Sequence, residues 1–131
     1  MHMGYSLTDL IGDVVQMSYV DYSDKGSVRR YNKLASRAAE YWLGKIPQWS
    51  DAELFDFEAQ VESENPYVSS YIIQALILEK ALPLDKVAQY AQKLKNNILL
   101  LEKCDAKTSL ELWFDMWKDG LIKSANKFHA D

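Results

Sequence analysis

Cysteine and histidine are nearly absent from this sequence of 131 residues. There is one cysteine, Cys104, and there are two histidines, His2 and His129. A single cysteine excludes an intramolecular disulfide framework. Histidines at opposite ends of the chain argue against a Cys/His zinc site, so we expect neither a metal nor a cofactor. The thiol of Cys104 has no histidine close to it in sequence that would activate it as a nucleophile.

Glycine and proline are also scarce, with five and three residues respectively. Turns should therefore be few, which favours long helices over a fold built from hairpins. No stretch approaches the roughly 18 apolar residues that a membrane span needs, so we expect no membrane partner. The first residues lack the basic and apolar regions of a secretion signal. We expect a single cytoplasmic domain over residues 1–131, a length that allows one hydrophobic core.

Positive charge is in the minority. The 15 Lys and Arg residues face 19 Asp and Glu residues, which gives a net charge of −4 and a pI of about 5.2. This balance argues against nucleic acid as a partner, because nucleic-acid binding usually needs a basic face. It fits a protein that meets a basic partner. Aromatic residues are plentiful, with eight Tyr and four Trp, and some of them are candidates for exposed anchors.

The spacing of apolar residues predicts an all-α fold of five to seven helices. Six of them are placed over residues 7–19, 27–43, 50–63, 67–81, 83–103 and 109–118. The segment 67–81 is apolar on almost every side, which is typical of a central, buried helix. The loops are short, so successive helices should pack as antiparallel hairpins, the third with the fourth and the fifth with the sixth.

Local signals predict where these helices begin and end. A capping box pairs a Ser or Thr with a Glu three residues later, each side chain bonding the other residue's backbone N–H. An Asn followed by Pro starts a helix, and a Gly commonly ends one. The predicted signals are an N-cap at Ser27, an end at Gly44, capping boxes at Ser50 with Glu53 and at Thr108 with Glu111, a start at Asn65 with Pro66, and an end at Gly120.

Six carboxylates crowd the segment 51–64, and no Lys or Arg interrupts them. They are Asp51, Glu53, Asp56, Glu58, Glu62 and Glu64. On a helical wheel they occupy both flanks of a core stripe of Leu54, Phe57 and Val61, while Phe55 points away from the core. An aromatic ring beside carboxylates is typical of a surface that captures a basic partner, and the alternative is an ordinary solvated face. Acids splayed over two flanks without a histidine argue against a metal or catalytic role.

A basic segment lies in the second predicted helix. It places five cations within thirteen residues, namely Lys25, Arg29, Arg30, Lys33 and Arg37. Cations with an aromatic residue among them are found in phosphate-binding surfaces, and Tyr31 is such a residue. The helical spacing, however, places Tyr31 on the apolar face, whereas Arg30, Lys33 and Arg37 face away from it. The pattern favours a solvated stripe, and pairing with the acidic third helix is a further alternative.

Two further residue pairs lie one turn apart on predicted helices. Asp9 and Asp13 have the spacing to share a cation, but we expect both to be exposed to solvent. Trp113 and Trp117 are expected to belong to the core and not to form a platform for stacked bases.

Two segments resemble small bacterial helical proteins. Residues 27–34, with the sequence SVRRYNKL, resemble the basic "V-R-x-x-N-x" helix of these proteins. The motifs Glu64-Asn65-Pro66-Tyr67-Val68, Ala75-Leu76 and Leu82-Pro83 are similar to the turn of their HEAT-like units. The resemblance covers about half of the chain. Genes of this type are often found beside polymorphic toxins, so the resemblance implies a HEAT-like fold and an immunity or accessory role.

The leading hypothesis is a non-catalytic protein-binding module, and its sharpest form is an immunity protein that covers the active site of a toxin. The candidate partner-binding residues are Trp49, Asp51, Glu53, Phe55, Asp56, Glu58, Glu62 and Glu64. The carboxylates would engage cations of a toxin domain, and Trp49 and Phe55 would supply the buried anchors. One alternative is a HEAT-like scaffold that binds peptides. Another is a small nucleic-acid accessory protein that uses Arg29, Arg30, Lys33 and Arg37.

Overall fold

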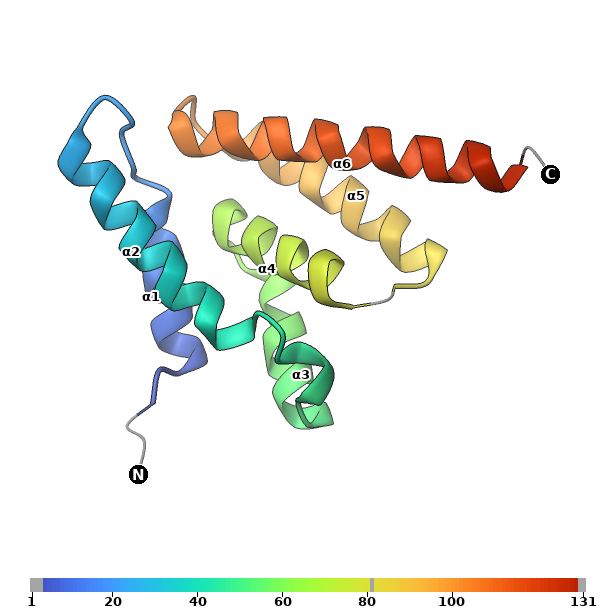
Figure 1. Ribbon diagram of the computed structural model, residues 1–131, viewed down its shortest axis with the longest axis horizontal. Coiled ribbons are helices and arrows are strands. Elements are labelled where there is room, and N and C mark those ends of the chain that lie inside the picture. Colours follow the sequence, from blue (N-terminus) through green and yellow to red (C-terminus); the bar gives the residue numbers. More distant parts are fainter. Residues whose placement is uncertain (1–3, 81, 130–131) are drawn as a thin grey trace.

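The computed structural model describes residues 4–80 and 82–129, with side chains as far as residue 118. Within these ranges the chain forms six α-helices and no strand, which confirms the predicted all-α fold. The helices are α1 (Leu7–Met17), α2 (Lys25–Trp42), α3 (Asp51–Ala59), α4 (Pro66–Glu79), α5 (Leu84–Leu100) and α6 (Asp105–His129) (Figure 1). Two short 3-10 helices, η1 (Ile46–Gln48) and η2 (Gln60–Glu62), flank α3. No helix in the described ranges is both long enough and apolar enough to cross a membrane.

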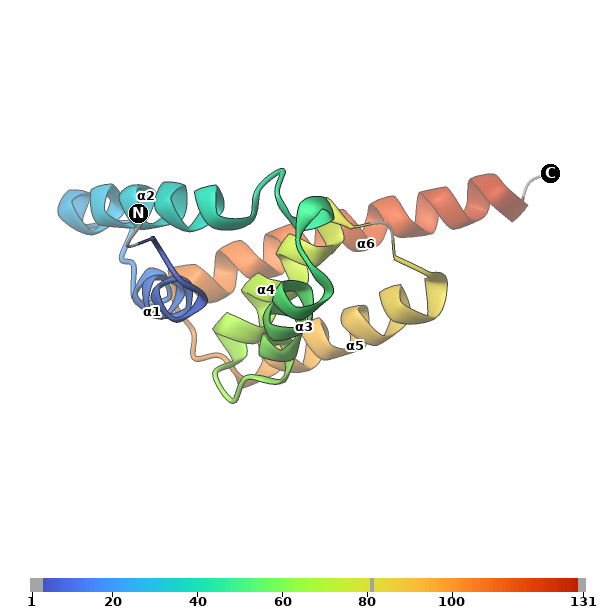
Figure 2. The ribbon, with the colours of Figure 1, turned by 90° about the horizontal axis from the view of Figure 1, so that it is seen from below.

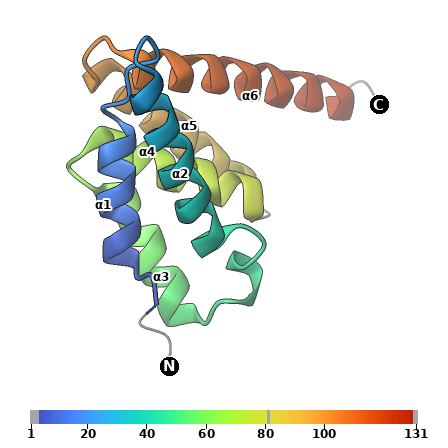
Figure 3. The same ribbon diagram turned by 60° about the vertical axis from the view of Figure 1, so that its left-hand side comes forward.

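The helices pack mainly as antiparallel neighbours. The closest pairs are α1 with α2 and α4 with α5, and Figures 1 and 3 show each pair running in opposite directions. Helix α6 returns along α5, and its C-terminal end extends away from the other helices (Figure 2). The predicted hairpins, α3 with α4 and α5 with α6, are also in contact but less extensively. Helix α3 is the short helix in the lower part of Figure 1, and it lies between α2 and α4 along the chain.

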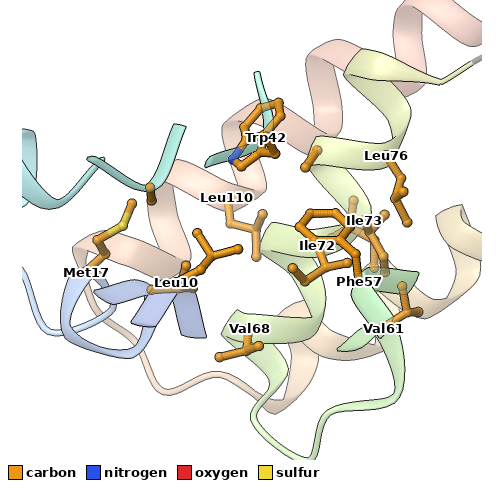
Figure 4. Close-up of a cluster of buried hydrophobic side chains, with 14 of the residues drawn as sticks. Leu10, Met17, Trp42, Phe57, Val61, Val68, Ile72, Ile73, Leu76 and Leu110 are labelled. Carbon is orange, nitrogen blue, oxygen red and sulfur yellow. The ribbon is translucent and has the colours of Figure 1, made fainter. Parts of the chain in front are cut away.

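Helix α4 lies at the centre of the core, as its apolar sequence predicts. Its side chains Val68, Ile72, Ile73, Ala75 and Leu76 are all buried. Side chains from other helices surround them, including Leu10 of α1, Phe57 of α3 and Leu110 of α6 (Figure 4). Burying apolar surface from so many elements against one helix is what holds the helices together.

The buried polar groups of this core are all hydrogen-bonded in the described part of the chain. Asn97 of α5 donates from Nδ2 to Oγ of Ser69 at 2.9 Å, and Ser69 in turn donates to the carbonyl of Val61 at 2.5 Å. Ser70 donates to the carbonyl of Pro66 at 2.7 Å. An unpaired polar group would be costly here, so these bonds make the serines of α4 compatible with full burial.

Several helix boundaries follow the sequence signals closely. The capping box at Ser50 and the start at Asn65 are confirmed, and Asn65 accepts from two backbone N–H groups at 2.9 and 3.2 Å. Gly44 follows α2 with a φ of 73°, in the left-handed region that favours glycine. The predicted cap at Ser27 is wrong. Asp24 caps α2 instead, because its side chain accepts from the N–H of Gly26 at 3.0 Å and allows the helix to begin at Lys25.

The predicted limits of the last helix are also wrong. Helix α6 already begins at Asp105, so Thr108 lies in its first turn and donates to the carbonyl of Cys104 at 3.1 Å instead of forming a capping box. The helix also continues through Gly120 to His129. A glycine costs a helix only about 1 kcal/mol, and no proline follows to stop it. Ala81, the predicted last residue of the fourth helix, lies outside the described residues, and α4 ends at Glu79.

Candidate functional site

Helix α3 is held in place from its start and from its inner face. Oγ of Ser50 accepts from the N–H of Glu53 at 3.2 Å, and Oε1 of Glu53 accepts from the N–H of Ser50 at 3.3 Å. The side chain of Phe57 is completely buried and confirms the predicted core stripe, together with buried Val61 and half-buried Leu54. The carboxylate of Glu53 therefore has a structural task in the capping box, and α3 presents a fixed outer face.

The outer face of α3 centres on Phe55. Its ring is 73% exposed, because successive helical residues are about 100° apart and Phe57 already takes the inward direction. Asp51 and Asp56 are exposed on either side of it, and the neighbouring small residues Ala52 and Ala59 are exposed as well. We call the set Asp51, Ala52, Phe55, Asp56 and Ala59 the α3 surface.

Two of the six carboxylates in residues 51–64 form ion pairs with lysines of this chain. Oε1 of Glu58 lies 2.8 Å from Nζ of Lys80, and Oε2 of Glu62 lies 3.7 Å from Nζ of Lys93. A cavity of about 250 Å³ separates this flank from α5, and Lys86 also lines it. The charge on this side of α3 is thus partly neutralised. Among the described residues, no Lys or Arg forms an ion pair with Asp51, Asp56 or Glu64, and all three are exposed.

Trp49 packs between Phe57 on the inner face of α3 and Tyr41 of α2. Its ring centroid lies 5.1 Å from that of Phe57 and 5.4 Å from that of Tyr41, and its side chain is half-buried against the core. Burial raises the pKa of Tyr41, and the nearby carboxylates of Glu53 and Asp56 raise it further. The aromatic cluster therefore fixes α3 on α2, and within the α3 surface itself the exposed ring belongs to Phe55.

The basic residues of α2 make no ion pair with α3 in the described structure. Arg37 instead binds Asp13 of α1, from Nε to Oδ2 and from Nη2 to Oδ1, each at 2.9 Å. Tyr5 donates its hydroxyl to Oδ2 of Asp13 at 2.5 Å. The expectation that Asp13 is exposed is wrong, because these partners allow its carboxylate to be buried; Asp9 is exposed as expected.

The Asp13 cluster is a feature that sequence reasoning missed. Burial raises the pKa of Tyr5, and its hydrogen bond to Asp13 raises that pKa further. A cavity of about 450 Å³ opens beside the cluster and is lined by Thr8, Gly12 and Gln16 as well. The only signal in the sequence was the pair of basic and acidic residues on neighbouring helices, which does not specify partners separated by 24 residues.

A larger cavity, of about 520 Å³, lies where α1 ends, α4 begins and α5 passes into α6. Tyr67 and the exposed Cys104 are among the residues that line it. Among the residues described with side chains, no three His, Cys, Asp or Glu residues lie close enough to hold a metal ion. His2 lies outside the described residues, and only the backbone of His129 is described.

Comparisons with known proteins assign this chain to no family. The sequence matches no protein-family model, and searches of curated proteins and of solved structures found no match for the chain. The α3 surface offers a ring that a partner can bury and carboxylates that can pair with cations.

Proposed function

We propose that this protein is a non-catalytic binding module that captures a basic protein partner through the α3 surface. The observation that carries the proposal is the 73% exposure of Phe55 between two exposed aspartates. Leaving an aromatic ring in water forgoes about 1.5–3 kcal/mol of burial free energy. A partner that covers the ring recovers this free energy, and a rigid aromatic on a packed helix loses little entropy on binding.

The charges around the ring define the partner chemistry. Asp51 and Asp56 have no ion pair in the described structure, so both are free to pair with Lys or Arg of a partner. Glu58 and Glu62 already bind lysines of this chain and would contribute mainly to the long-range field. The complementary partner has an apolar pocket with cations at its rim. Charge complementarity of this kind speeds association and excludes acidic competitors.

The sharpest form of the proposal is an immunity protein of the cytoplasm that neutralises a toxin domain. Active sites that handle nucleic acid are rich in cations, because they must hold phosphates. The α3 surface has the negative charge and the exposed aromatic ring that covering such a site requires. The resemblance of residues 27–34 and 64–83 to proteins encoded beside toxins supports the same proposal. A HEAT-like scaffold that binds peptides is the competing hypothesis.

The test compares two double variants as bait in a pull-down from the source cell. The test variant is Phe55→Ala with Asp56→Lys. The control is Leu84→Ala with Asp85→Lys, because Leu84 is 87% exposed and Asp85 is also exposed, so the same adjacent pair is changed on another helix. We expect the wild type and the control to capture the same basic protein and the test variant to lose it. The affinity for the purified partner should fall at least about 30-fold, since a buried aromatic anchor is worth 2 kcal/mol or more.

Two results would overturn the proposal. One is equal affinity of both variants for the captured partner, which would place the binding surface elsewhere. The other is a partner whose contact face is acidic. For the immunity form, cells that produce the toxin should grow with the wild type or the control, and should stop growing with the test variant.

A further inference from the structure

A row of cations runs along the exposed face of α2. Lys25, Arg29, Lys33 and Arg37 are spaced four residues apart, and all four are exposed. Four residues advance an α-helix by about 6 Å and turn it by about 40°, so the row extends over about 18 Å of the axis along a ridge that winds around the helix. We call these four residues the cationic row. Helix α2 carries five cations in all against one carboxylate, Glu40, within a chain whose net charge is −4.

The cationic row is unfavourable for α2 itself. Like charges four residues apart repel each other and destabilise a helix. Lys25 lies in the first turn, where the helix dipole disfavours a cation, and this turn has no acidic residue. Of the four residues of the row, only Arg37 has an ion-pair partner in the described part of the chain, namely Asp13. The other three cations of the row repel each other without an ion pair of their own, and unfavourable local chemistry of this kind is typical of a functional surface.

The position of the row separates it from the acidic α3 surface. Figures 1 and 3 both show the beginning of α2 at the opposite end of the molecule from α3. Lys25 is about 25 Å of helix away from Trp42, the end of α2 that leads towards α3. Charges separated by more than about 10 Å are largely screened at 0.1 M salt. The acidic α3 surface therefore contributes little to the electrostatic potential at the start of the cationic row.

The two carboxylates that directly precede α2 in the sequence form hydrogen bonds within their own segment. Asp24 accepts from the N–H of Gly26 at 3.0 Å, and Asp21 accepts from the N–H and the hydroxyl of Ser23 at 2.9 and 2.7 Å. These hydrogen bonds lower the pKa of Asp21, so it stays charged, but neither carboxylate forms an ion pair with the row. Three cations, Lys25, Arg29 and Lys33, remain available to a ligand.

We propose that the cationic row binds the phosphodiester backbone of nucleic acid, without preference for base sequence. The ammonium groups of two lysines and the guanidinium fork of Arg29, about 6 Å apart along one ridge of the helix, can each pair with a phosphate. Tyr31, the aromatic residue within this segment, is half-buried and is not part of the row, so base stacking is not expected. Three free cations give weak binding, with a Kd in the range of about 10⁻⁴ to 10⁻⁶ M. This function is separate from capture of a protein by the α3 surface.

The experiment measures fluorescence anisotropy of a labelled DNA duplex of about 20 base pairs, titrated with full-length protein at two salt concentrations. Three phosphate contacts predict a loss of about 40-fold in affinity between 50 and 200 mM salt. The variant Lys25→Gln, Arg29→Gln, Lys33→Gln should bind at least about tenfold more weakly at the lower salt. These substitutions are on an exposed face, so circular dichroism should show an unchanged helix content.

The control is Lys45→Gln, Lys95→Gln, Lys103→Gln, which changes the net charge equally at exposed lysines away from the row. It should bind the duplex almost as well as the wild type does. Equal losses in the two variants, or no binding of the wild type at 50 mM salt and protein concentrations up to about 10⁻⁴ M, would overturn the proposal. Tighter binding of poly-L-glutamate than of DNA at equal charge concentration would also overturn it, and would indicate an acidic protein as the ligand.

Discussion

Asp13 of α1 and Arg37 of α2 bind each other side by side through two hydrogen bonds of 2.9 Å. The side chain of Asp13 is only 8% exposed, whereas that of Arg37 is 51% exposed. The guanidinium group therefore covers the carboxylate from the solvent side. The hydroxyl of Tyr5 donates a further hydrogen bond to the same carboxylate. This contact ties together the two helices that form the first hairpin of the fold. Neither residue belongs to the α3 surface, so its contribution can be measured independently of partner binding.

Removing the carboxylate should destabilise the protein. We expect Asp13→Ala to lower the free energy of unfolding by about 2 kcal/mol, because it leaves the Tyr5 hydroxyl without its acceptor and opens a void between α1 and α2. Arg37→Ala should also be destabilising. The double variant should lose less than the two single effects together, since both remove the same contact. Urea denaturation followed by circular dichroism measures all three, with exposed Glu102→Ala as the control. Additive losses would show that the pair is not energetically coupled.

Much of the helical framework could be predicted because its signals are local in sequence. Asn65 bonds the N–H groups two and three residues later, and Ser50 bonds Glu53 three residues later. The exposure of Phe55 also follows locally, since a helix that buries Phe57 turns Phe55 outward. Such features depend on few residues and need no knowledge of which helices meet.

What could not be predicted depends on contacts between distant residues. The burial of Asp13 requires Arg37, and the half-buried position of Trp49 requires both Tyr41 and Phe57. The ion pair between Glu58 and Lys80 likewise joins residues that are distant in sequence. It occupies one of the carboxylates that the sequence analysis assigned to partner binding. A helical wheel gives the direction of a side chain, but it does not identify the neighbour in that direction.

Two glycines should respond to alanine with opposite signs. Gly12 lies in the middle of α1, and a Cβ atom there would meet nothing within 4 Å. Gly12→Ala should raise the free energy of unfolding by about 0.5–1 kcal/mol, because glycine carries an entropic cost in a helix. Gly44 has a φ of 73°, so Gly44→Ala should lower it by about 1–2 kcal/mol. Thermal denaturation of the two variants gives both signs. A destabilising Gly12→Ala would mean that the outer face of α1 is not open.

The start of α4 and the start of α6 should differ in their sensitivity to cap substitutions. Asn65→Ala removes the acceptor for two N–H groups at the beginning of the buried helix, so the free energy of unfolding should fall by about 1 kcal/mol. Thr108→Ala should change it by no more than about 0.5 kcal/mol, because Thr108 already lies inside α6. Urea denaturation of both variants makes the comparison. An equal loss of stability in both variants would indicate that Thr108 caps α6, as the sequence predicted, and that the helix does not begin at Asp105.

The stability of the fold should decline in alkaline solution because of its tyrosines. Burial raises the pKa of six tyrosines above the ordinary value of 10.0, namely Tyr5, Tyr31, Tyr41, Tyr67, Tyr71 and Tyr90. Above pH 10 the unfolded chain loses these protons while the folded chain retains them. The stabilisation is therefore complete below the unfolded pKa and is lost as the pH rises through the folded pKa values.

Tyr67 offers the sharpest test of this pH dependence. It is one of the most strongly shifted tyrosines, with burial as the first cause, and it lies at the start of α4. Tyr67→Phe removes its ionisable hydroxyl, so the free energy of unfolding should fall less steeply above pH 10 than in the wild type. Tyr19→Phe, at a ring that is 77% exposed, serves as the control. Denaturation curves at a series of pH values, with phenolate absorbance of the folded protein, provide the measurement. If every tyrosine of the folded protein formed phenolate near pH 10, the prediction would be contradicted. The folded and unfolded pKa values would then be equal, and tyrosine ionisation would not change the free energy of unfolding.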